Sequence, residues 1–568
     1  MSQAQQLITE HIDIWTSAIV AKSGVGRGSS KKRELYGIKK LRDLILELAV
    51  RGKLVPQDPT DEPASVLLER ISDEATELVK AKKIKKPKIL PQITDDEKPF
   101  VLPAGWEWER LPSCYYIVGS KINQIQTKEY LELGSYLVVD QGQKFIAGYC
   151  DDKSKVLEIE RPVIVFGDHT KNIKFIDFNF VIGADGVKVL CPYSELSTRF
   201  LYQVIKSYDL ADRGYARHFK VLNEKLAPLP PLAEQHRIVA KVDELMLLCD
   251  QLEQQTEASI DAHATLVEVL LSTLTDSADA DELAQNWARI AEHFDTLFTT
   301  EQSIDALKQT ILQLAVMGKL VPQNPDDEPA SVLLDKIAAE KAKLVEEKKI
   351  KKQKPLSMIE DNEKPYDVPG NWAWCRIGNA SISTDYGLSS KTSNDDNGVP
   401  VLKMGDIQAS KVITGGQGTV SKETEGLPYL YLESRDLLYN RTNSVELVGK
   451  TGIFTGNNDD YSFASYLIRI RTLKNSVLPE FININMASPD FRKNQIMPHI
   501  KQQCGQANVN GTIMKNMLIA LAPESEQHRI VAKVDELFEI CDKLKDKLQQ
   551  SQQTQVHLTD ALVDSALA

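Results

Sequence analysis

The chain contains 568 residues, of which 42% are hydrophobic and 26% charged; this is the composition of soluble globular protein and leaves room for about four domains. No apolar run approaches the ~20 residues that cross a membrane, and the first residues lack the pattern of a signal peptide. The seven cysteines include no Cys-x-x-Cys pair, so we expect a reduced, cytoplasmic protein without a disulfide framework or a zinc site. The net charge of −12, taken alone, argues against nucleic-acid binding, but an acidic helical scaffold can carry that charge and a partner can supply further positive surface.

The first predicted element is a helix over residues 1–22. Its apolar residues recur at helical spacing, at Leu7, Ile8, Ile12, Trp15 and Ile19. The segment Ser23–Lys32 (SGVGRGSSKK) breaks this helix. We interpret it as a solvated linker or, through its basic residues, as a DNA contact.

Two further helices are expected before the first β-rich region. Leu41–Arg51 is amphipathic and ends before Gly52 and Pro56. Asp61-Glu62-Pro63 opens the second helix, which we expect to run on into Lys80–Lys88. This segment has six lysines in nine residues, which favours either a solvated helix end or a contact to the DNA backbone.

A β-rich module follows, with turns such as Gly183-Ala184-Asp185-Gly186 between its strands. Strands are predicted at Tyr136–Val139, Pro162–Phe166, Phe175–Ile176, Phe180–Ile182 and Val187–Leu190, and a helix at Ser197–Ser207. The module is therefore of mixed α and β type.

A long helix is predicted from about residue 233 to 274, because its apolar residues alternate at spacings of four and three. They are Ile238, Val242, Leu245, Cys249 and Leu252, and the C-terminal segment repeats the rhythm at Ile530, Val534, Leu537, Cys541, Leu544 and Leu548. Such spacing is typical of a coiled coil, so the two helices are expected to pair, in an antiparallel sense, and to bury both cysteines as small apolar residues.

The chain is built by duplication. Glu234–Leu245 and Glu526–Leu537 are identical (EQHRIVAKVDEL), and Leu41–Ile71 recurs as Leu307–Ile337 with 22 of 31 positions the same. The second copy includes its own lysine-rich segment, Lys341–Lys354. A second mixed module follows, with strands predicted at Val399–Met404, Leu437–Tyr439, Gly452–Phe454 and Tyr466–Arg471 and a helix at Pro479–Ala487. The two modules share no visible sequence, so two different readers are carried by one repeated frame.

No catalytic motif is found. Gly449-Lys450-Thr451 has Ser444 where a phosphate-binding loop needs glycine, and no dinucleotide, adenine-methyltransferase, metalloprotease or serine-hydrolase signature is present. The repeated Gln-His-Arg lies at a helix start in the frame, where capping or contacts between helices or with a partner are expected. The paired tryptophans, Trp106/Trp108 and Trp372/Trp374, are expected to anchor the core.

These repeats resemble the specificity subunits of type I restriction–modification systems. The resemblance rests on Pro228–Leu245 (PLPPLAEQHRIVAKVDEL), on the GKLVPQ…DEPAS element that begins at Gly52, and on Gly-x-Trp-x-Trp at Gly105, and it covers nearly the whole chain. It implies two target-recognition domains that each read one half of a split, asymmetric double-stranded DNA sequence. It also implies a helical spacer that binds two methyltransferase subunits, together with restriction subunits that translocate DNA. S-adenosylmethionine, ATP and magnesium are then expected on those partners, for adenine methylation or cleavage, with no cofactor or metal in this chain.

The resulting prediction is an α+β fold with an internal pseudo-twofold repeat, in which two α/β recognition domains are separated by an antiparallel coiled-coil spacer. The expected domains are a helical region at 1–105, a first module at 106–230, a central helical region at 231–369, a second module at 370–523 and a coiled-coil helix at 524–568.

DNA-binding candidates are chosen by residue type, since Arg and Lys read guanine, Asn and Gln read adenine, and all four also contact phosphate. In the first module they are Arg213, Tyr215, Arg217, His218 and Lys220, then Gln141, Gln143 and Lys144, and then His169 and Lys171 after Asp168. In the second module they are Lys501, Gln502, Gln503, Gln506 and Asn508, with Lys403, Arg441 and Asn443. The sequence thus predicts a non-catalytic DNA-recognition subunit; the alternatives are a methyltransferase–specificity fusion enzyme and a coiled-coil scaffold that binds only protein.

Overall fold

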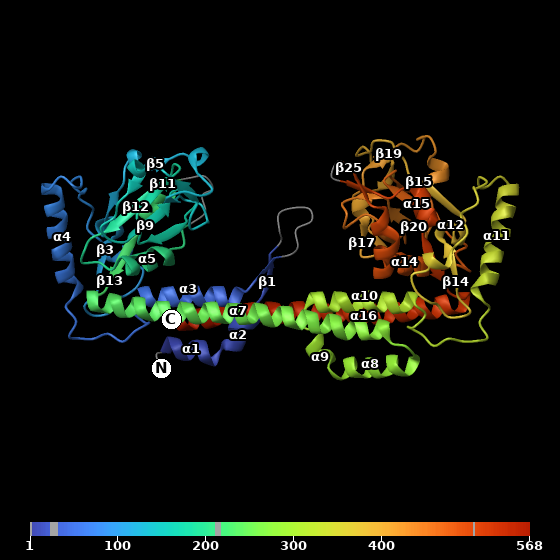
Figure 1. Cartoon of the computed structure of the whole chain (residues 1–568), viewed down its shortest axis with the longest axis horizontal. Helices are drawn as coiled ribbons and strands as arrows, with labels where there is room; N and C mark the ends of the chain where they lie inside the picture. The colour runs from blue at the N-terminus through green and yellow to red at the C-terminus, as the bar shows by residue number, and fades with distance from the viewer. Residues whose placement is uncertain (1–2, 23–31, 211–216, 504–505) are drawn as a thin grey trace. The chain divides into compact units, whose positions relative to one another are not determined.

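The computed structural model describes residues 3–22, 32–210, 217–503 and 506–568. They divide into two compact units: residues 3–22, 32–210, 217–258 and 552–568 form the first, and residues 259–503 and 506–551 the second. Helix α7 (Leu232–Asp276) begins in the first unit and ends in the second, and α16 (Glu524–Leu567) begins in the second and ends in the first (Figure 1). The long helix predicted at 233–274 is therefore confirmed, and the two helices pass through the two units in opposite order.

The N-terminal part of the first unit is less helical than predicted. Helices α1 (Gln3–Glu10) and α2 (Ile12–Ser17) are followed by strand β1 (Val20–Lys22), which pairs with β2 (Lys32–Glu34), so the helix predicted over 1–22 is wrong beyond Ser17. The chain approaches α2 closely here, because a Cβ on Gly37 would lie 2.3 Å from the Trp15 carbonyl oxygen. The segment 23–31, predicted as a linker or DNA contact, lies outside the described residues.

Helix α3 (Tyr36–Val50) begins earlier than predicted, and α4 (Ala64–Lys80) ends earlier. Lys82 has a φ of 56°, and the amide of Lys83 donates to the Leu78 carbonyl, which closes the helix end. The second copy repeats this geometry: α10 (Glu301–Val316) is followed by α11 (Ala330–Glu346), and Lys348 has a φ of 58°. The prediction that the first helix runs on into Lys80–Lys88 is therefore wrong beyond Lys80, whereas α11 extends into Lys341–Lys354 as far as Glu346.

The first module contains two sheets, and its predicted strands and helix are confirmed to within about two residues. A four-stranded antiparallel sheet has the order β10-β9-β12-β4, and a mixed sheet has the order β5-β11-β6-β7, with β8 against β11. The bounds are β4 Tyr115–Val118, β5 Gln124–Ile125, β6 Tyr136–Val139, β7 Gly148–Cys150, β8 Val156–Leu157, β9 Val163–Gly167, β10 Ile173–Ile176, β11 Phe180–Gly183, β12 Val187–Pro192, α5 Thr198–Ser207 and α6 His218–Leu222.

The second module has a different sheet plan. Six strands take the order β15-β24-β20-β22-β18-β17, and two three-stranded sheets have the orders β19-β16-β23 and β21-β26-β25. The bounds are β15 Ser383–Tyr386, β16 Val399–Leu402, β17 Ile407–Gln408, β18 Lys411–Val412, β19 Thr419–Val420, β20 Leu437–Asn440, β21 Thr442–Asn443, β22 Thr451–Ile453, β23 Ser462–Phe463, β24 Leu467–Arg471, α14 Pro479–Ala487, β25 Lys501–Gln503, β26 Gln506–Asn508 and α15 Gly511–Asn516. The predicted strands and α14 are confirmed here as well.

Each module enters and leaves through one pair of strands. In the first module, β3 (Glu107–Arg110) pairs antiparallel with β13 (Leu226–Leu229). In the second, β14 (Ala373–Arg376) pairs antiparallel with β27 (Leu518–Leu521). Each module is thus an insertion whose two ends lie side by side.

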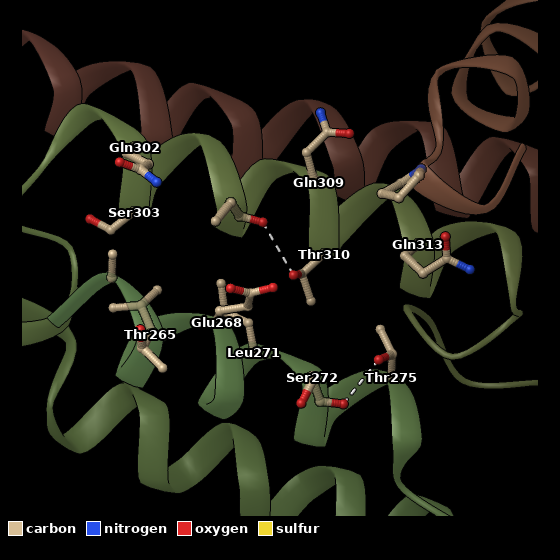
Figure 2. A pocket seen from close by; sticks show the side chains of 14 residues that line it. Thr265, Glu268, Leu271, Ser272, Thr275, Gln302, Ser303, Gln309, Thr310 and Gln313 are labelled. Carbon is tan, nitrogen blue, oxygen red and sulfur yellow. Dashed lines mark hydrogen bonds between the residues drawn. The ribbon is translucent and has the colours of Figure 1, made fainter. Parts of the chain in front are cut away.

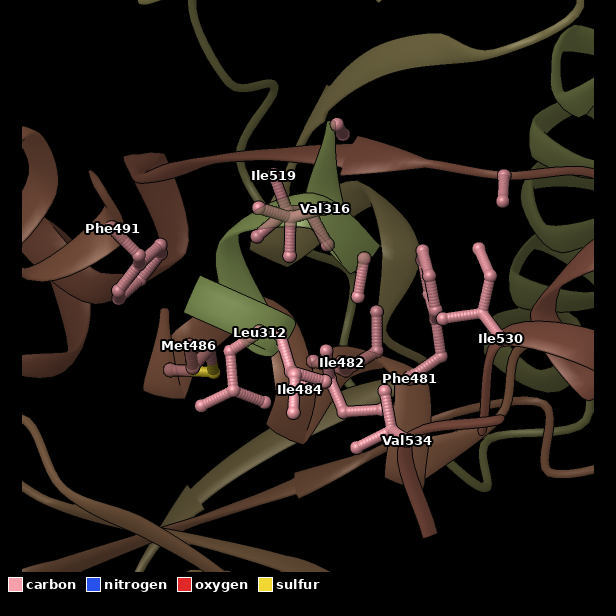
Figure 3. Packing of buried hydrophobic residues seen from close by; sticks show 14 of the residues in the cluster. Leu312, Val316, Phe481, Ile482, Ile484, Met486, Phe491, Ile519, Ile530 and Val534 are labelled. Carbon is pink, nitrogen blue, oxygen red and sulfur yellow. The ribbon is translucent and has the colours of Figure 1, made fainter. Parts of the chain in front are cut away.

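Each unit has a core that joins its module to the helical frame. In the second unit, Leu312 and Val316 of α10 pack with Phe481 and Ile484 of α14 and with Ile530 of α16 (Figure 3). In the first unit, α3 packs against α5, and Leu245 and Cys249 of α7 are buried. The predicted stripe of α7 is therefore buried, and that of α16 is buried at Ile530, Val534 and Cys541 and partly buried at Leu537, Leu544 and Leu548.

Both long helices contribute to both cores. Val267, Leu271 and Leu274 of α7 belong to the core of the second unit, and Leu562 and Val563 of α16 pack on the core of the first. Helix α8 (Ala280–Glu292) was not predicted from the sequence. It follows α7 and precedes α10 along the chain, and Asp279 caps its N-terminus.

Candidate nucleic-acid interface

A duplicated polar network fixes each module to its frame. The Glu234 carboxylate accepts from Trp106 Nε1 at 3.0 Å and from Gln57 Nε2 at 2.9 Å, and Glu526 accepts from Trp372 at 2.9 Å and from Gln323 at 2.5 Å. Burial raises the pKa of Glu526, while the bonds from Trp372 and Gln323 oppose the shift. The prediction that the tryptophans anchor the core is confirmed for Trp106 and Trp372, which are buried.

The repeated Gln-His-Arg completes this network. Gln235 accepts from the amide of Ser197, the N-cap residue of α5, and Gln527 accepts from the amide of Leu478, the N-cap residue of α14, each at 2.9 Å. Arg237 forms an ion pair with Asp61 at 2.6 Å, and Arg529 does so with Asp327 at 2.6 Å. The predicted contacts with other elements are thus confirmed for the glutamine and arginine of each copy, whereas His236 and His528 are exposed. Equivalent residues of the two repeats thus hold two modules that share no sequence similarity.

In the first module, the predicted candidates Gln141, His169 and Lys171 lie in the loops that follow strands β6 and β9. These loops meet the turn between β11 and β12. The side chain of Gln141 accepts from the amide of His169 at 3.2 Å and donates to the Asp185 carbonyl at 2.9 Å. A Cβ on Gly186, which has a φ of 85°, would lie 2.6 Å from His169, so glycine is needed where these loops meet. Lys171 donates to the Leu210 carbonyl at 3.1 Å, next to the segment 211–216.

The start of α6 joins this loop cluster. The amides of His218 and Phe219 donate to the Asp168 backbone carbonyl and side chain, each at 2.8 Å. His218 is 1% exposed, and its Nδ1 lies 3.1 Å from the Asp168 carbonyl oxygen. The His218 ring is therefore buried beside Asp168 in this structure, and its contact with DNA stays a prediction. Arg217 and Lys220 beside it are exposed.

The other candidates of the first module are surface residues. Gln143 and Lys144 are exposed in the loop after β6. Lys174, which the sequence reading missed, holds this loop by donating to the carbonyls of Asp140 at 2.8 Å and Lys144 at 2.6 Å. Burial lowers the pKa of Lys174, and Asp140 partly offsets that shift. Arg213 and Tyr215 lie outside the described residues.

In the second module, strand pairing brings two predicted segments together. Strands β25 and β26, which contain Lys501, Gln502, Gln503, Gln506 and Asn508, form a hairpin, and β26 pairs with β21, so that Thr442 lies opposite Asn508 and Asn443 opposite Ala507. The side chains of residues 501–506 lie outside the described set, while Asn508 is exposed.

Arg441 lies beside this hairpin. Its guanidinium carbon is 5.0 Å from the centre of the Tyr386 ring, and its Nε donates to the Ser465 carbonyl at 2.7 Å. The Tyr386 hydroxyl accepts from the amide of Gly511 at 2.7 Å. Lys403 is exposed elsewhere in the module and donates to Thr392 Oγ1 at 3.0 Å. Tyr386 was missed by sequence reasoning, because a lone tyrosine in a short strand carries no local signal.

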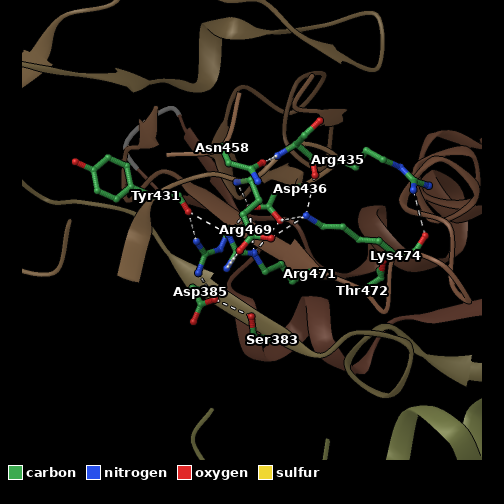
Figure 4. Close-up of polar contacts among 12 residues, drawn as sticks. Ser383, Asp385, Tyr431, Arg435, Asp436, Asn458, Arg469, Arg471, Thr472 and Lys474 are labelled. Atoms are coloured by element: carbon green, nitrogen blue, oxygen red, sulfur yellow. Dashed lines mark hydrogen bonds and ion pairs between the residues drawn. The ribbon is translucent and has the colours of Figure 1, made fainter. Parts of the chain in front are cut away.

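A buried charge network stiffens the same module (Figure 4). Arg469, which is fully buried, pairs with Asp385 at 3.0 Å, and Arg471 pairs with the buried Asp436 at 2.9 Å. Lys474 adds an ion pair to Glu433 at 3.0 Å. These pairs connect β15 to β24 and to the loop before β20, so the edge strand that carries Tyr386 is fixed.

A groove of about 480 Å³ between α7 and α10 is lined by small, apolar and amide side chains, and Glu268 is its single ionisable residue (Figure 2). Among the residues that the structure describes, no three His, Cys, Asp or Glu side chains are grouped as a metal site requires.

Comparison with known proteins decides the family. The chain is 41% identical to the type I restriction enzyme EcoEI specificity subunit of Escherichia coli and 42% identical to the EcoAI specificity subunit of the same species. Each alignment covers 99% of both chains. The chain belongs to the type I restriction specificity subunits.

Two further comparisons concern a family model and a solved structure. Residues 372–551 match the family model of the type I restriction modification DNA specificity domain. A chain in a solved structure described as a type I R-M system shows 17% identity over 83% of this chain and 99% of its own, with a TM-score of 0.47. In the described part of the specificity subunit, no helix has the length and apolarity needed to cross a membrane.

Proposed function

We propose that this specificity subunit reads a two-part, asymmetric DNA sequence, with the first module on one half-site and the second module on the other. The observation that carries this proposal is the duplicated anchor, in which Glu234 and Gln235 hold one module and Glu526 and Gln527 hold a module of different strand order. Because the same contacts hold two modules of different fold, we expect each module to recognise DNA independently of the other. Because the modules differ, we expect the two halves of the target sequence to differ as well.

The proposal gives the specificity subunit no chemistry of its own. Two methyltransferase subunits carry S-adenosylmethionine and methylate adenine, and restriction subunits carry ATP and magnesium and cleave DNA, all in the cytoplasm. The relatives are specificity subunits of type I restriction enzymes, which supports an assembly with further subunits. The lack of a phosphate-binding motif in the sequence favours nucleotide chemistry on a partner.

An exchange of modules tests the division of labour. Residues 109–226 are replaced by the equivalent module of a related specificity subunit, and methylated sites are mapped in cells that carry the complete system. We expect one half-site to change, while the other half-site and the gap between them stay the same. The reciprocal exchange of residues 375–518 is the matched control. Changes in both half-sites after a single exchange would refute independent reading.

A second test separates this proposal from its alternatives. The isolated chain is assayed for S-adenosylmethionine binding and methyl transfer, and the assembled complex for discrimination between its target and a scrambled duplex. We expect no activity from the chain alone and strong discrimination by the complex. Methyl transfer by the isolated chain would indicate a fusion enzyme, and a complex that does not discriminate would indicate a scaffold that binds only protein.

A further inference from the structure

The lysine-rich segment of the second unit is fixed to helix α11 at its start and to strand β14 just beyond its end. We call residues 348–354 the lysine strap. At its start, the amides of Lys348 and Lys349 donate to the carbonyls of Val345 and Leu344 at 3.1 and 2.9 Å, which turns the chain back from α11. Just beyond its end, Arg376 donates to the Ser357 carbonyl at 2.8 Å and to the Met358 carbonyl at 2.9 Å. The strap is therefore part of the folded unit.

The strap lines a groove of about 720 Å³, whose other walls are β15 and α15. Lys348, Lys351, Lys352 and Lys354 are exposed, and Lys515 of α15 lines the same groove. Among the described residues, no carboxylate forms an ion pair with these five lysines, whereas Lys349 pairs with Glu347 at 2.8 Å.

The acidic residue of the groove does not neutralise it. Asp385 accepts from Arg469 at 3.0 Å and from the Tyr429 hydroxyl at 2.9 Å, so its charge is already compensated. The buried hydroxyl of Thr384, also in the groove, has no hydrogen-bond partner within the described part of the chain. Five positive charges thus line one groove in a chain of net charge −12.

We propose that the lysine strap and Lys515 bind consecutive phosphates of the DNA backbone beside the half-site that the second module reads. This inference rests on the proposed function. Lysine ammonium groups are point charges without the planar fork that reads a base edge, so they suit phosphate. Even if all seven residues of the strap were extended they would span at most about 23 Å, which is the axial rise of about seven phosphates along one strand and therefore limits the strap to a few neighbouring phosphates.

Continuity with the candidate base-reading residues favours DNA as the polyanion. Strand β15 borders the groove and also carries Tyr386, which contacts Arg441. Helix α15, which supplies Lys515, begins three residues after Asn508 of the β25–β26 hairpin. A DNA strand that contacts the hairpin can therefore continue into the groove, because β15 and α15, which line the groove, adjoin the elements that carry the candidate base-reading residues.

The test uses the assembled complex with its mapped target duplex. The triple substitution Lys351→Gln, Lys352→Gln, Lys354→Gln removes three exposed charges. We expect the slope of log affinity against log salt to shrink by about 0.9 for each lost contact, up to about 2.7, with unchanged discrimination between target and scrambled half-sites and unchanged methylated sequence. The control removes three exposed lysines outside the groove by Lys343→Gln, Lys543→Gln and Lys547→Gln, and should leave the slope near that of the wild type.

Duplexes with single neutral methylphosphonate linkages locate the contacts. The wild-type complex should lose affinity at a few linkages beside the second half-site, and the strap variant should be insensitive at those same linkages. A wild-type salt slope in the strap variant, an equal loss in the control, or altered base discrimination would overturn the proposal. A wild-type complex that fails to discriminate its target would instead overturn the proposed function.

Discussion

The contact of Gln527 with the start of α14 gives the sharpest test of how a module is held. Gln527 is fully buried, accepts from the Leu478 amide at 2.9 Å and donates to the Ala522 carbonyl at 2.9 Å. Gln527→Ala leaves both backbone groups unsatisfied. Since each buried unsatisfied group costs about 1–3 kcal/mol, we expect the two groups together to lower the stability of this contact by about 2–6 kcal/mol.

The loss should be local to the second module. Hydrogen exchange of the amides in α14 should accelerate by about thirty-fold or more, since 1.4 kcal/mol corresponds to a factor of ten, while α5 should exchange as in the wild type. Gln235→Ala is the matched control, because Gln235 makes the same contacts with Ser197 and the Pro230 carbonyl. It should accelerate α5 and spare α14. Equal acceleration of both helices by either variant, or of neither, would refute the reasoning.

Four further predictions follow from other contacts. Leu245→Asp places a charge in the buried stripe of α7 and should lower the melting temperature and impair assembly, since an unpaired buried charge costs several kcal/mol; an unchanged melting profile would contradict it. Asp436→Ala leaves Arg471 without its buried partner and should cost about 3–5 kcal/mol in a denaturant titration, whereas a cost below 1 kcal/mol would show that solvent compensates. Arg217→Ala should weaken DNA binding. If Arg217 reads a base, discrimination at one base-pair position should fall by about 1–3 kcal/mol; if it contacts phosphate, the slope of log affinity against log salt should fall by about one. Unchanged affinity and specificity would show that Arg217 is not part of the interface. Burial raises the pKa of Cys249 to about 11, so the native protein should resist alkylation of this thiol at pH 8 and react only after unfolding; rapid native labelling would refute its burial.

The sequence predicts those features that depend on local periodicity. The four-and-three spacing through Leu245 and Cys249 gives the long helix and its buried face, because the helical repeat alone decides which residues share that face. The strand segments of both modules are also found, since short runs of β-branched and aromatic residues end at glycine or polar turns.

Features that depend on long-range pairing are missed. The end of α4 at Lys80 has no glycine or proline signal, because Lys82 itself adopts the left-handed conformation. The meeting of Gln141, His169 and His218 joins segments that lie far apart in the chain, and only the fold shows that His218 is buried while Arg217 is exposed.

The anchor network is an intermediate case, since its members are all conserved between the two repeats. Gln57, Trp106 and Glu234 recur as Gln323, Trp372 and Glu526. A polar residue that recurs in both repeats together with a tryptophan indicates a buried hydrogen bond between them. The repeats in the sequence therefore already pointed to these contacts. Which donor meets which acceptor still required the structure.

The pairing of the entry and exit strands has a consequence for how such a chain can change its length. From β3 to β13 the first module spans 123 residues, and from β14 to β27 the second spans 149. Because its entry and exit strands are paired, each module is a closed loop inserted into the frame. The entropy of closing such a loop depends only on the logarithm of the number of residues in it. The difference between the two modules then amounts to about 0.2 kcal/mol, so a module can gain or lose surface loops at almost no entropic cost to the frame that carries it.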